Sequence, residues 1–417
     1  MSRTQNRPPG QGQAGPAAPV EDARRGQPVL MLALATLGFA VNFWAWALLS
    51  PLGPRYKELL ALSGSQQALL VAVPVVVGSL GRIPVGALTD RYGGRTMFPI
   101  VSLATIVPVL FIGLVGQSSL TWLLIGGFFL GIGGTTFAIG VPFVNAWFPP
   151  ERRGFAIGVF GAGMGGTAIS ALTTVTLVKN VGAPAPFLIT AAVLAGYAVL
   201  ARVLLRDAPG RVVPTASVAT RLAAAARLPI AWQACILYAV AFGGYVAFSV
   251  YLPAYLRTAY GLEQADAANR MAGFVLLAVV MRPFGGWLSD RIGPIAVLGG
   301  VFAVVATGAA VQATTPDLVP LGTIAFLSMA AALGAGSGAT FALVARSAPA
   351  AQVGAVTGLV GAAGGLGGFV PPLVMGAVYS SRGSYGLGLA LLALVAAGCL
   401  VLSATIVRAT ALRAARA

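Results

Sequence analysis

Two arginines of this 417-residue chain fall inside long apolar stretches, where a charged side chain is least expected. Arg82 and Arg282 begin the matching segments RIPVGALTDRYG and RPFGGWLSDRIG, which stand 200 residues apart. An arginine at the centre of a membrane costs on the order of 2.5–3.5 kcal/mol on insertion scales. Because a guanidinium stays protonated at biological pH, each arginine needs a partner that compensates its charge.

No carboxylate lies deep within an apolar stretch, so a bound anion is the remaining partner. The planar fork of guanidinium donors fits a planar oxyanion through parallel hydrogen bonds. Arg82 lies eight residues before Asp90, about 12 Å along a helix, which is too deep for simple snorkelling to the membrane surface. We therefore expect the two arginines to bind a small anion. The acidic residues all stand in tails, loops or span ends: Glu21, Asp22, Glu58, Asp90, Glu151, Asp207, Glu263, Asp266, Asp290 and Asp317.

The apolar stretches that hold these arginines are predicted membrane spans. The chain is 58% hydrophobic and 9% charged, whereas an average soluble protein carries roughly 25% charged residues. Uninterrupted apolar runs of about twenty residues indicate helices and not the alternating strands of a barrel. The fold class is thus an all-α integral membrane protein with twelve helices. We predict spans at 29–52, 66–88, 96–116, 120–146, 154–178, 184–205, 231–256, 268–289, 294–314, 318–345, 353–378 and 385–407.

The basic residues between the spans predict the orientation of the chain. With the N-terminus inside, inner segments hold 18 Lys and Arg and outer segments 6, which places both termini in the cytoplasm. The net charge of +16 is then a membrane-topology signal, and we expect no nucleic acid as a partner. We expect a monomer surrounded by lipid in the inner membrane of the cell. Its predicted parts are a disordered basic tail (1–28), two six-helix halves (29–205 and 231–407), a cytoplasmic linker (206–230) and a C-terminal tail (408–417).

Two glycine-rich spans repeat at the same offset of 200 residues as the arginines. GFAIGVFGAGMGGTA begins at Gly154 and GAVTGLVGAAGGLGG begins at Gly354. Two motifs that keep one offset indicate a duplicated six-span unit. Glycines at spacings of three and four let neighbouring helices approach closely, near the site that we expect between the halves. The glycines in question are Gly158, Gly161, Gly163 and Gly165 in the first half, and Gly361, Gly364, Gly365 and Gly367 in the second.

The loops after the second and eighth spans resemble a known signature. GALTDRYGGR, from Gly86 to Arg95, is similar to the loop motif of the major facilitator superfamily, and GWLSDRIG is similar to its second-half counterpart. The resemblance covers all twelve spans and implies two halves with a substrate site near the midplane between them. It also implies a cytoplasmic gate that latches the halves, built from Gly86, Asp90, Arg91, Arg95, Asp290 and Arg291.

Within that superfamily the chain resembles the nitrate/nitrite porters. The resemblance rests on two glycine-rich motifs: GFAIGVFGAGMGGTA in the fifth span and VTGLVGAAGGLGGFVPP in the eleventh span. It implies that Arg82 and Arg282 bind the anion with three aromatic residues, Phe137, Tyr238 and Phe242. One position departs from the family pattern: Met164 stands where the signature carries an asparagine, which puts the preference for nitrate or nitrite in question.

The predicted mechanism is exchange of nitrate and nitrite by alternating access. Proton-driven carriers usually keep Asp, Glu or His within their spans, and this chain has no histidine and no deep carboxylate. Two alternatives stay open: an exchanger of small organic anions such as formate, oxalate or monocarboxylates, and a transporter-like nutrient sensor. Neither an enzyme nor a cofactor or metal site is expected, because no nucleophile–base pair and no ligand cluster stands in the sequence.

Overall fold

The computed structural model describes residues 27–149, 153–209, 216–349 and 352–410. Twelve helical segments in these ranges are long and apolar enough to cross a membrane, which confirms the predicted fold class. Most of the predicted tails, 1–28 and 408–417, lie outside the described residues. The twelve segments are Gln27–Leu59, Gly64–Tyr92, Gly94–Leu114, Leu120–Trp147, Ala156–Asn180, Ala185–Leu204, Pro229–Tyr260, Gln264–Ile292, Pro294–Ala313, Leu318–Ser347, Ala355–Arg382 and Gly386–Thr410.

Several of these segments consist of two helices in series. In the first half the helices are α2 (Gln27–Trp46), α3 (Leu49–Leu59), α4 (Gly64–Leu80), α5 (Arg82–Tyr92), α6 (Gly94–Leu114), α7 (Leu120–Leu130), α8 (Thr136–Trp147), α9 (Arg153–Gly161), α10 (Gly166–Asn180) and α11 (Ala185–Leu204). In the second half they are α13 (Pro229–Tyr260), α14 (Gln264–Ile292), α15 (Pro294–Ala313), α16 (Thr323–Ser347), α17 (Val353–Gly367), α18 (Val370–Arg382) and α19 (Gly386–Leu402).

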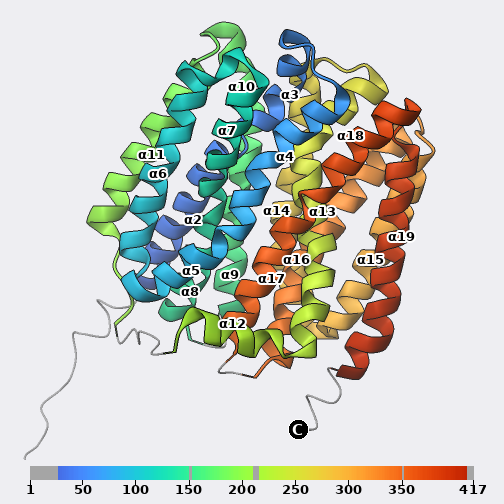
Figure 1. Cartoon of the computed structure of the whole chain (residues 1–417). Coiled ribbons are helices and arrows are strands. Elements are labelled where there is room, and N and C mark those ends of the chain that lie inside the picture. The colour runs from blue at the N-terminus through green and yellow to red at the C-terminus, as the bar shows by residue number, and fades with distance from the viewer. Residues whose placement is uncertain (1–26, 150–152, 210–215, 350–351, 411–417) are drawn as a thin grey trace, which may run out of the picture.

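The helices form two bundles that lie side by side. In Figure 1, α2 to α11 make up the blue-to-green bundle and α13 to α19 the yellow-to-red one. Between them the predicted linker 206–230 holds a short helix, α12 (Val218–Ala226), and the first two residues of α13. Helix α12 was not predicted from the sequence. Helices α3, α4, α9 and α10 of the first bundle pack against α13, α14, α17 and α18 of the second.

The second span of each half ends at the same kind of turn. Gly93 and Gly293, 200 residues apart, end α5 and α14 with φ of +83° and +88°. An L side chain is strained at such angles, so glycine is the residue that fits. The repeated loop motif therefore specifies the point at which each of these spans stops.

Three membrane spans of the first half are interrupted close in sequence to Arg82, Phe137 and Gly161. The second span is interrupted at Gly81, directly before Arg82, and 3-10 turns interrupt the fourth span at Gly131–Thr135 and the fifth at Ala162–Gly165 (η4). By contrast, α13 and α14 run without a break through Tyr238 and Arg282. Irregular backbone at membrane depth is tolerated where protein or a cavity surrounds it, which marks this region as the interior of the molecule.

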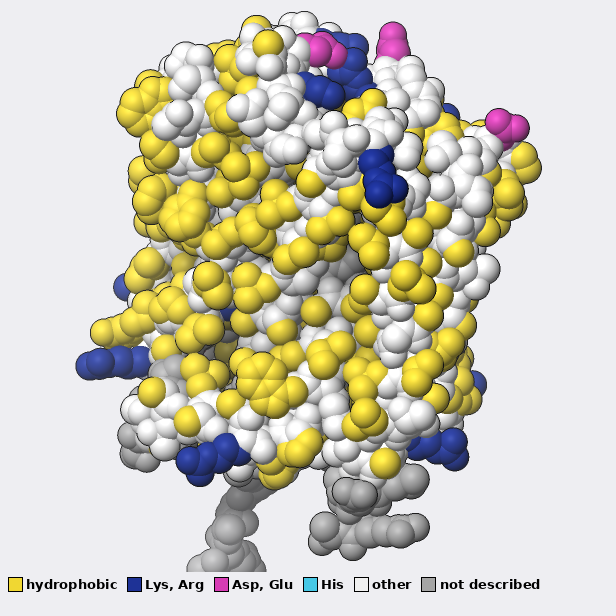
Figure 2. Space-filling model, turned by 45° about the vertical axis from the view of Figure 1, so that its right-hand side comes forward, with side chains coloured by type: hydrophobic (Ala, Val, Ile, Leu, Met, Phe, Trp, Pro, Cys, Tyr) yellow, Lys and Arg dark blue, Asp and Glu magenta, His cyan; other side chains and the backbone are white. Residues whose placement is uncertain are grey.

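The outer surface has the pattern of a membrane protein. Figure 2 shows a broad band of apolar side chains, with most of the visible charged side chains near the two ends of the molecule. Large apolar residues such as Val107, Val199 and Leu394 are more than 65% exposed on this surface. Lipid covers such a band at no cost, so the twelve helices form a multi-pass membrane protein.

Candidate anion-binding site

The two intramembrane arginines lie at one place between the halves. Arg82 begins α5 in the first half, and Arg282 lies within α14 in the second; they are 6% and 1% exposed. The guanidinium carbon of Arg82 lies 5.1 Å from the ring centre of Phe137 and 5.6 Å from that of Phe242. The guanidinium carbon of Arg282 lies 5.6 Å from each of the same two rings. The two cations thus share one aromatic enclosure and repel one another across it.

Each arginine reaches across to a glycine of the opposite half. Arg82 Nη1 donates a hydrogen bond to the carbonyl oxygen of Gly361 in α17. Arg282 lies over Gly161 in α9, where an added Cβ would stand 2.9 Å from Arg282 Nε. Gly161 and Gly361 are 200 residues apart, so the two crossings are symmetry-related. A side chain at Gly161 would push the guanidinium away, and this explains why glycine occurs there.

The partners of both guanidiniums are neutral. Arg282 Nη2 donates to the Tyr238 hydroxyl over 3.2 Å, and Arg282 Nη1 lies 3.1 Å from the Met164 sulfur. Arg82 Nε is buried and has no hydrogen-bond partner. Within the described ranges neither arginine forms an ion pair. The candidate site therefore holds two buried positive charges and unused donors, a pattern that an anion would complement.

The aromatic side chains form a wall around the arginines. Tyr238 and Phe242, four residues apart on α13, stack with ring centres 5.0 Å apart and planes within 3°. Phe137 of α8 faces Phe242 across the interface between the halves, with ring centres 6.4 Å apart. Phe341 of α16 completes the wall, with its ring centre 5.9 Å from the Arg282 guanidinium carbon. Phe341 could not be predicted from the sequence, because one phenylalanine in an apolar span carries no distinguishing signal.

A cavity of about 150 Å³ leads from Arg82 towards the side of the molecule that carries α12. Arg82, Phe137 and Gly361 line its inner end, and Asp90 and Arg221 line its mouth. A water molecule takes up roughly 30 Å³ in the liquid, so the cavity has room for a small anion with a few waters. The candidate site is therefore approached from the α12 side.

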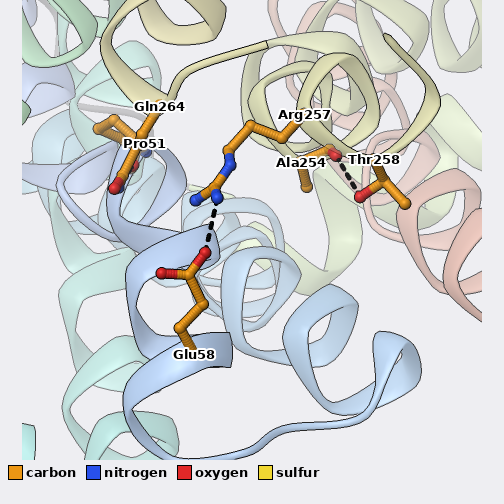
Figure 3. Close-up of polar contacts among 6 residues, drawn as sticks. All are labelled: Pro51, Glu58, Ala254, Arg257, Thr258 and Gln264. Carbon is orange, nitrogen blue, oxygen red and sulfur yellow. Dashed lines mark hydrogen bonds and ion pairs between the residues drawn. The ribbon is translucent and has the colours of Figure 1, made fainter. Parts of the chain in front are cut away.

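The opposite side is closed by polar contacts between the halves. Figure 3 shows Arg257 of α13 reaching Glu58 of α3, with 2.6 Å between Nη2 and Oε1. Gln264 Nε2 donates to the Pro51 carbonyl over 2.8 Å beside this pair. Deeper in the same interface Ser50 Oγ lies 2.9 Å from the Ser249 carbonyl oxygen. Contacts between the halves thus close the side away from α12, whereas the cavity lies on the α12 side.

Comparisons with known proteins agree with this architecture. The model of the Major Facilitator Superfamily matches residues 35–372 and 272–415. The chain is 52% identical over 367 residues to a probable nitrate/nitrite transporter, NarK2, of Mycobacterium tuberculosis (strain H37Rv), covering 87% of this chain and 92% of that protein. The chain belongs to the nitrate/nitrite porters of the major facilitator superfamily.

Other relatives of this porter extend the comparison. It is 37% identical over 376 residues to the nitrite extrusion protein of Bacillus subtilis (strain 168), covering 89% of this chain and 93% of that one. The crystal structure of a bacterial homologue of the human lysosomal transporter Spinster, in an inward-facing and occupied conformation, matches with a TM-score of 0.65 at 19% identity, over 94% of this chain and 97% of that one. At that identity the likeness is one of fold.

The predicted gate residues of the porter lie on the α12 side. Asp90 pairs with Arg221 of α12, and Asp290 pairs with Arg346 of α16 over 3.2 Å. The Asp90 pair thus joins α5 to the linker helix, whereas the Asp290 pair stays within the second half. Gly86 lines the cavity, and an Asp207 oxygen accepts a hydrogen bond from the Arg95 backbone nitrogen. The guanidiniums of Arg91 and Arg291 lie over the rings of Tyr92 and Trp287, respectively.

The predicted signature glycines divide into two groups. Gly161, Gly361 and Gly364 adjoin the site; an added Cβ at Gly364 would stand 2.2 Å from the Tyr238 ring. The others serve helix packing around it. Their nearest neighbours are Pro283 for Gly158, Phe39 for Gly163, Val279 for Gly165, Ser79 for Gly365 and the Ala239 backbone for Gly367.

Proposed function

We propose that this porter exchanges nitrate and nitrite across the inner membrane of the cell, with the anion held between Arg82 and Arg282. The observation that carries the proposal is the pair of buried, unpaired arginines in one aromatic enclosure. A planar oxyanion meets the donor forks of both arginines and replaces the missing negative charge. The printed names of the relatives, a nitrate/nitrite transporter and a nitrite extrusion protein, support the choice of substrates.

The same electrostatics supports exchange. In the empty site two like charges face each other in a medium of low dielectric, which opposes closure of the halves around them. A bound anion removes part of this repulsion and allows the rocking step, so passage in either direction needs a loaded site. Among the residues that the structure describes, neither arginine pairs with a carboxylate that a proton could neutralise instead, and Asp90, at the mouth of the cavity, pairs with Arg221.

The proposed orientation places α12 and both termini in the cytoplasm. The excess of Lys and Arg in the segments on this side supports it. The conformation in hand is then open inwards, with the Glu58–Arg257 pair closing the outer side. The porter works as a monomer in this proposal, because each half supplies one arginine and one crossing glycine to the single site.

A ligand panel on the purified porter tests the proposal. Nitrate, nitrite, formate, chloride and oxalate are titrated separately, and each is then offered in counterflow to proteoliposomes loaded with nitrate. We expect nitrate and nitrite to bind and to exchange for each other, with formate weaker and chloride and oxalate inactive. Tight binding of oxalate or formate without nitrate would instead establish the organic-anion exchanger, and binding without counterflow would establish a sensor.

A further inference from the structure

We propose that Met164 is an internal competitor for the anion: its thioether occupies Arg282 in the empty site and is displaced when the anion binds. This inference deepens the proposed function and rests on it. It starts from one contact, the 3.1 Å between Met164 Sδ and Arg282 Nη1. The contact joins the halves, since Met164 belongs to the first and Arg282 to the second.

Hydrogen bonds hold the backbone of Met164, whereas its thioether can change rotamer. The residue lies in the 3-10 turn η4 and is fully buried. Its carbonyl oxygen accepts hydrogen bonds from Thr167 Oγ1 over 2.9 Å and from the Tyr245 hydroxyl over 3.3 Å. The unbranched thioether has three rotatable bonds. It can therefore leave the guanidinium without any change in the helix that carries it.

The two acceptors on Arg282 differ in strength. Tyr238 offers a hydroxyl oxygen and Met164 offers a thioether, which is a weak acceptor. A hydrogen bond from a guanidinium to an ionised oxygen is roughly twice as strong as a neutral one. An incoming oxyanion therefore takes the place of the sulfur and leaves the hydroxyl bound. Because the thioether is neutral, it satisfies a donor without reducing the positive charge that attracts the anion.

The internal repeat shows that a thioether contacts the arginine in one half only. The position that matches Met164 at the 200-residue offset is Gly364, against which the ring of Tyr238 packs. Arg82 accordingly has no side-chain partner there and donates to the Gly361 backbone. Arg82 lines the cavity, whereas Arg282 and Met164 do not. An anion that enters from the cavity meets Arg82 first and reaches Arg282 by displacing the sulfur.

Two substitutions of similar volume give opposite results if this is correct. Met164→Leu removes the acceptor, so the anion has nothing to displace, and nitrate should bind about two- to tenfold more tightly. Met164→Gln offers a stronger acceptor, and nitrate should bind about two- to tenfold more weakly. Titration of nitrate into each purified variant measures this. The maximal exchange rate of Met164→Leu should fall while its KM falls, because a tighter complex releases the anion more slowly.

Met329→Leu is the matched control, since Met329 is also fully buried but packs against Gly308 away from the arginines. Its nitrate affinity should equal that of the wild type. In an Arg282→Lys background the difference between Met164→Leu and Met164→Gln should shrink, because the shared guanidinium is gone. If both Met164 variants weaken binding alike, or neither changes it, Met164 is only a packing residue. Failure of the wild type to bind nitrate is a separate outcome, which overturns the proposed function.

Discussion

Replacement of Arg82 by lysine keeps the positive charge of the site but removes the planar fork of guanidinium donors. Arg82 is 6% exposed, lies over two aromatic rings, lines the cavity and has a buried Nε donor without a hydrogen-bond partner. An ammonium group offers a point charge in place of two parallel donors. The loss is about one hydrogen bond to a charged group, or roughly 1.5–3 kcal/mol. Nitrate binding to Arg82→Lys should therefore weaken by about 10- to 150-fold.

Isothermal titration of nitrate into the purified variant measures this loss. Arg282→Lys should show a loss of the same order, because the second guanidinium shares the same enclosure. Arg270→Lys is the control: Arg270 is an exposed residue paired with Asp266 one turn away on the same helix, and its nitrate affinity should be unchanged. Wild-type affinity in Arg82→Lys, with the variant folded, would refute the assignment of this arginine to the site.

Three further predictions concern the contacts between the halves and the charges of the site. Gly161→Ala should lower nitrate affinity at least severalfold, because its Cβ would stand 2.9 Å from Arg282 Nε. Gly196→Ala in α11 has open space around its Cβ and should bind nitrate as the wild type does; equal affinities of the two variants would contradict the close contact between Gly161 and Arg282. Glu58→Gln should weaken the closure of the outer side, which is measured with a Ser50→Cys reporter in a background without native cysteines. Thiol reagents added from the outer side should label this cysteine up to about fivefold faster, since an exposed pair is worth at most about 1 kcal/mol. An unchanged labelling rate would show that the Glu58–Arg257 pair does not hold this side closed. Nitrate affinity should stay flat between about pH 6 and 8, since guanidiniums do not titrate there, and a tenfold change over that range would indicate a titrating group in the site.

The sequence was sufficient for the fold because each span carries its own signal. Length and apolarity predict the twelve spans without reference to any neighbour, and the glycines at 93 and 293 specify where two of them stop. Helix α12 escaped prediction because its nine residues are too few for a membrane span. Its Arg221 meets Asp90 only in the folded chain.

The candidate site was predictable where charge or repetition distinguished a residue. Arg82 and Arg282 stood out as cations in apolar spans, and the repeat paired them. Phe341 and the contact of Met164 with Arg282 did not stand out, because both depend on which helix of the other half lies opposite. The family pattern indicated that Met164 is unusual but not which group it touches.

Uptake of labelled nitrate into proteoliposomes tests the central claim most directly. Vesicles that contain the porter are loaded with nitrite, with nitrate or with neither, and a proton gradient is imposed in a parallel set. We predict rapid uptake in the vesicles loaded with either anion, little uptake in the unloaded ones whether or not the gradient is present, and loss of uptake in Arg82→Lys and Arg282→Lys. Rapid uptake into unloaded vesicles driven by the proton gradient alone would contradict the exchange mechanism, in which the repulsion between the two arginines prevents the empty porter from changing sides.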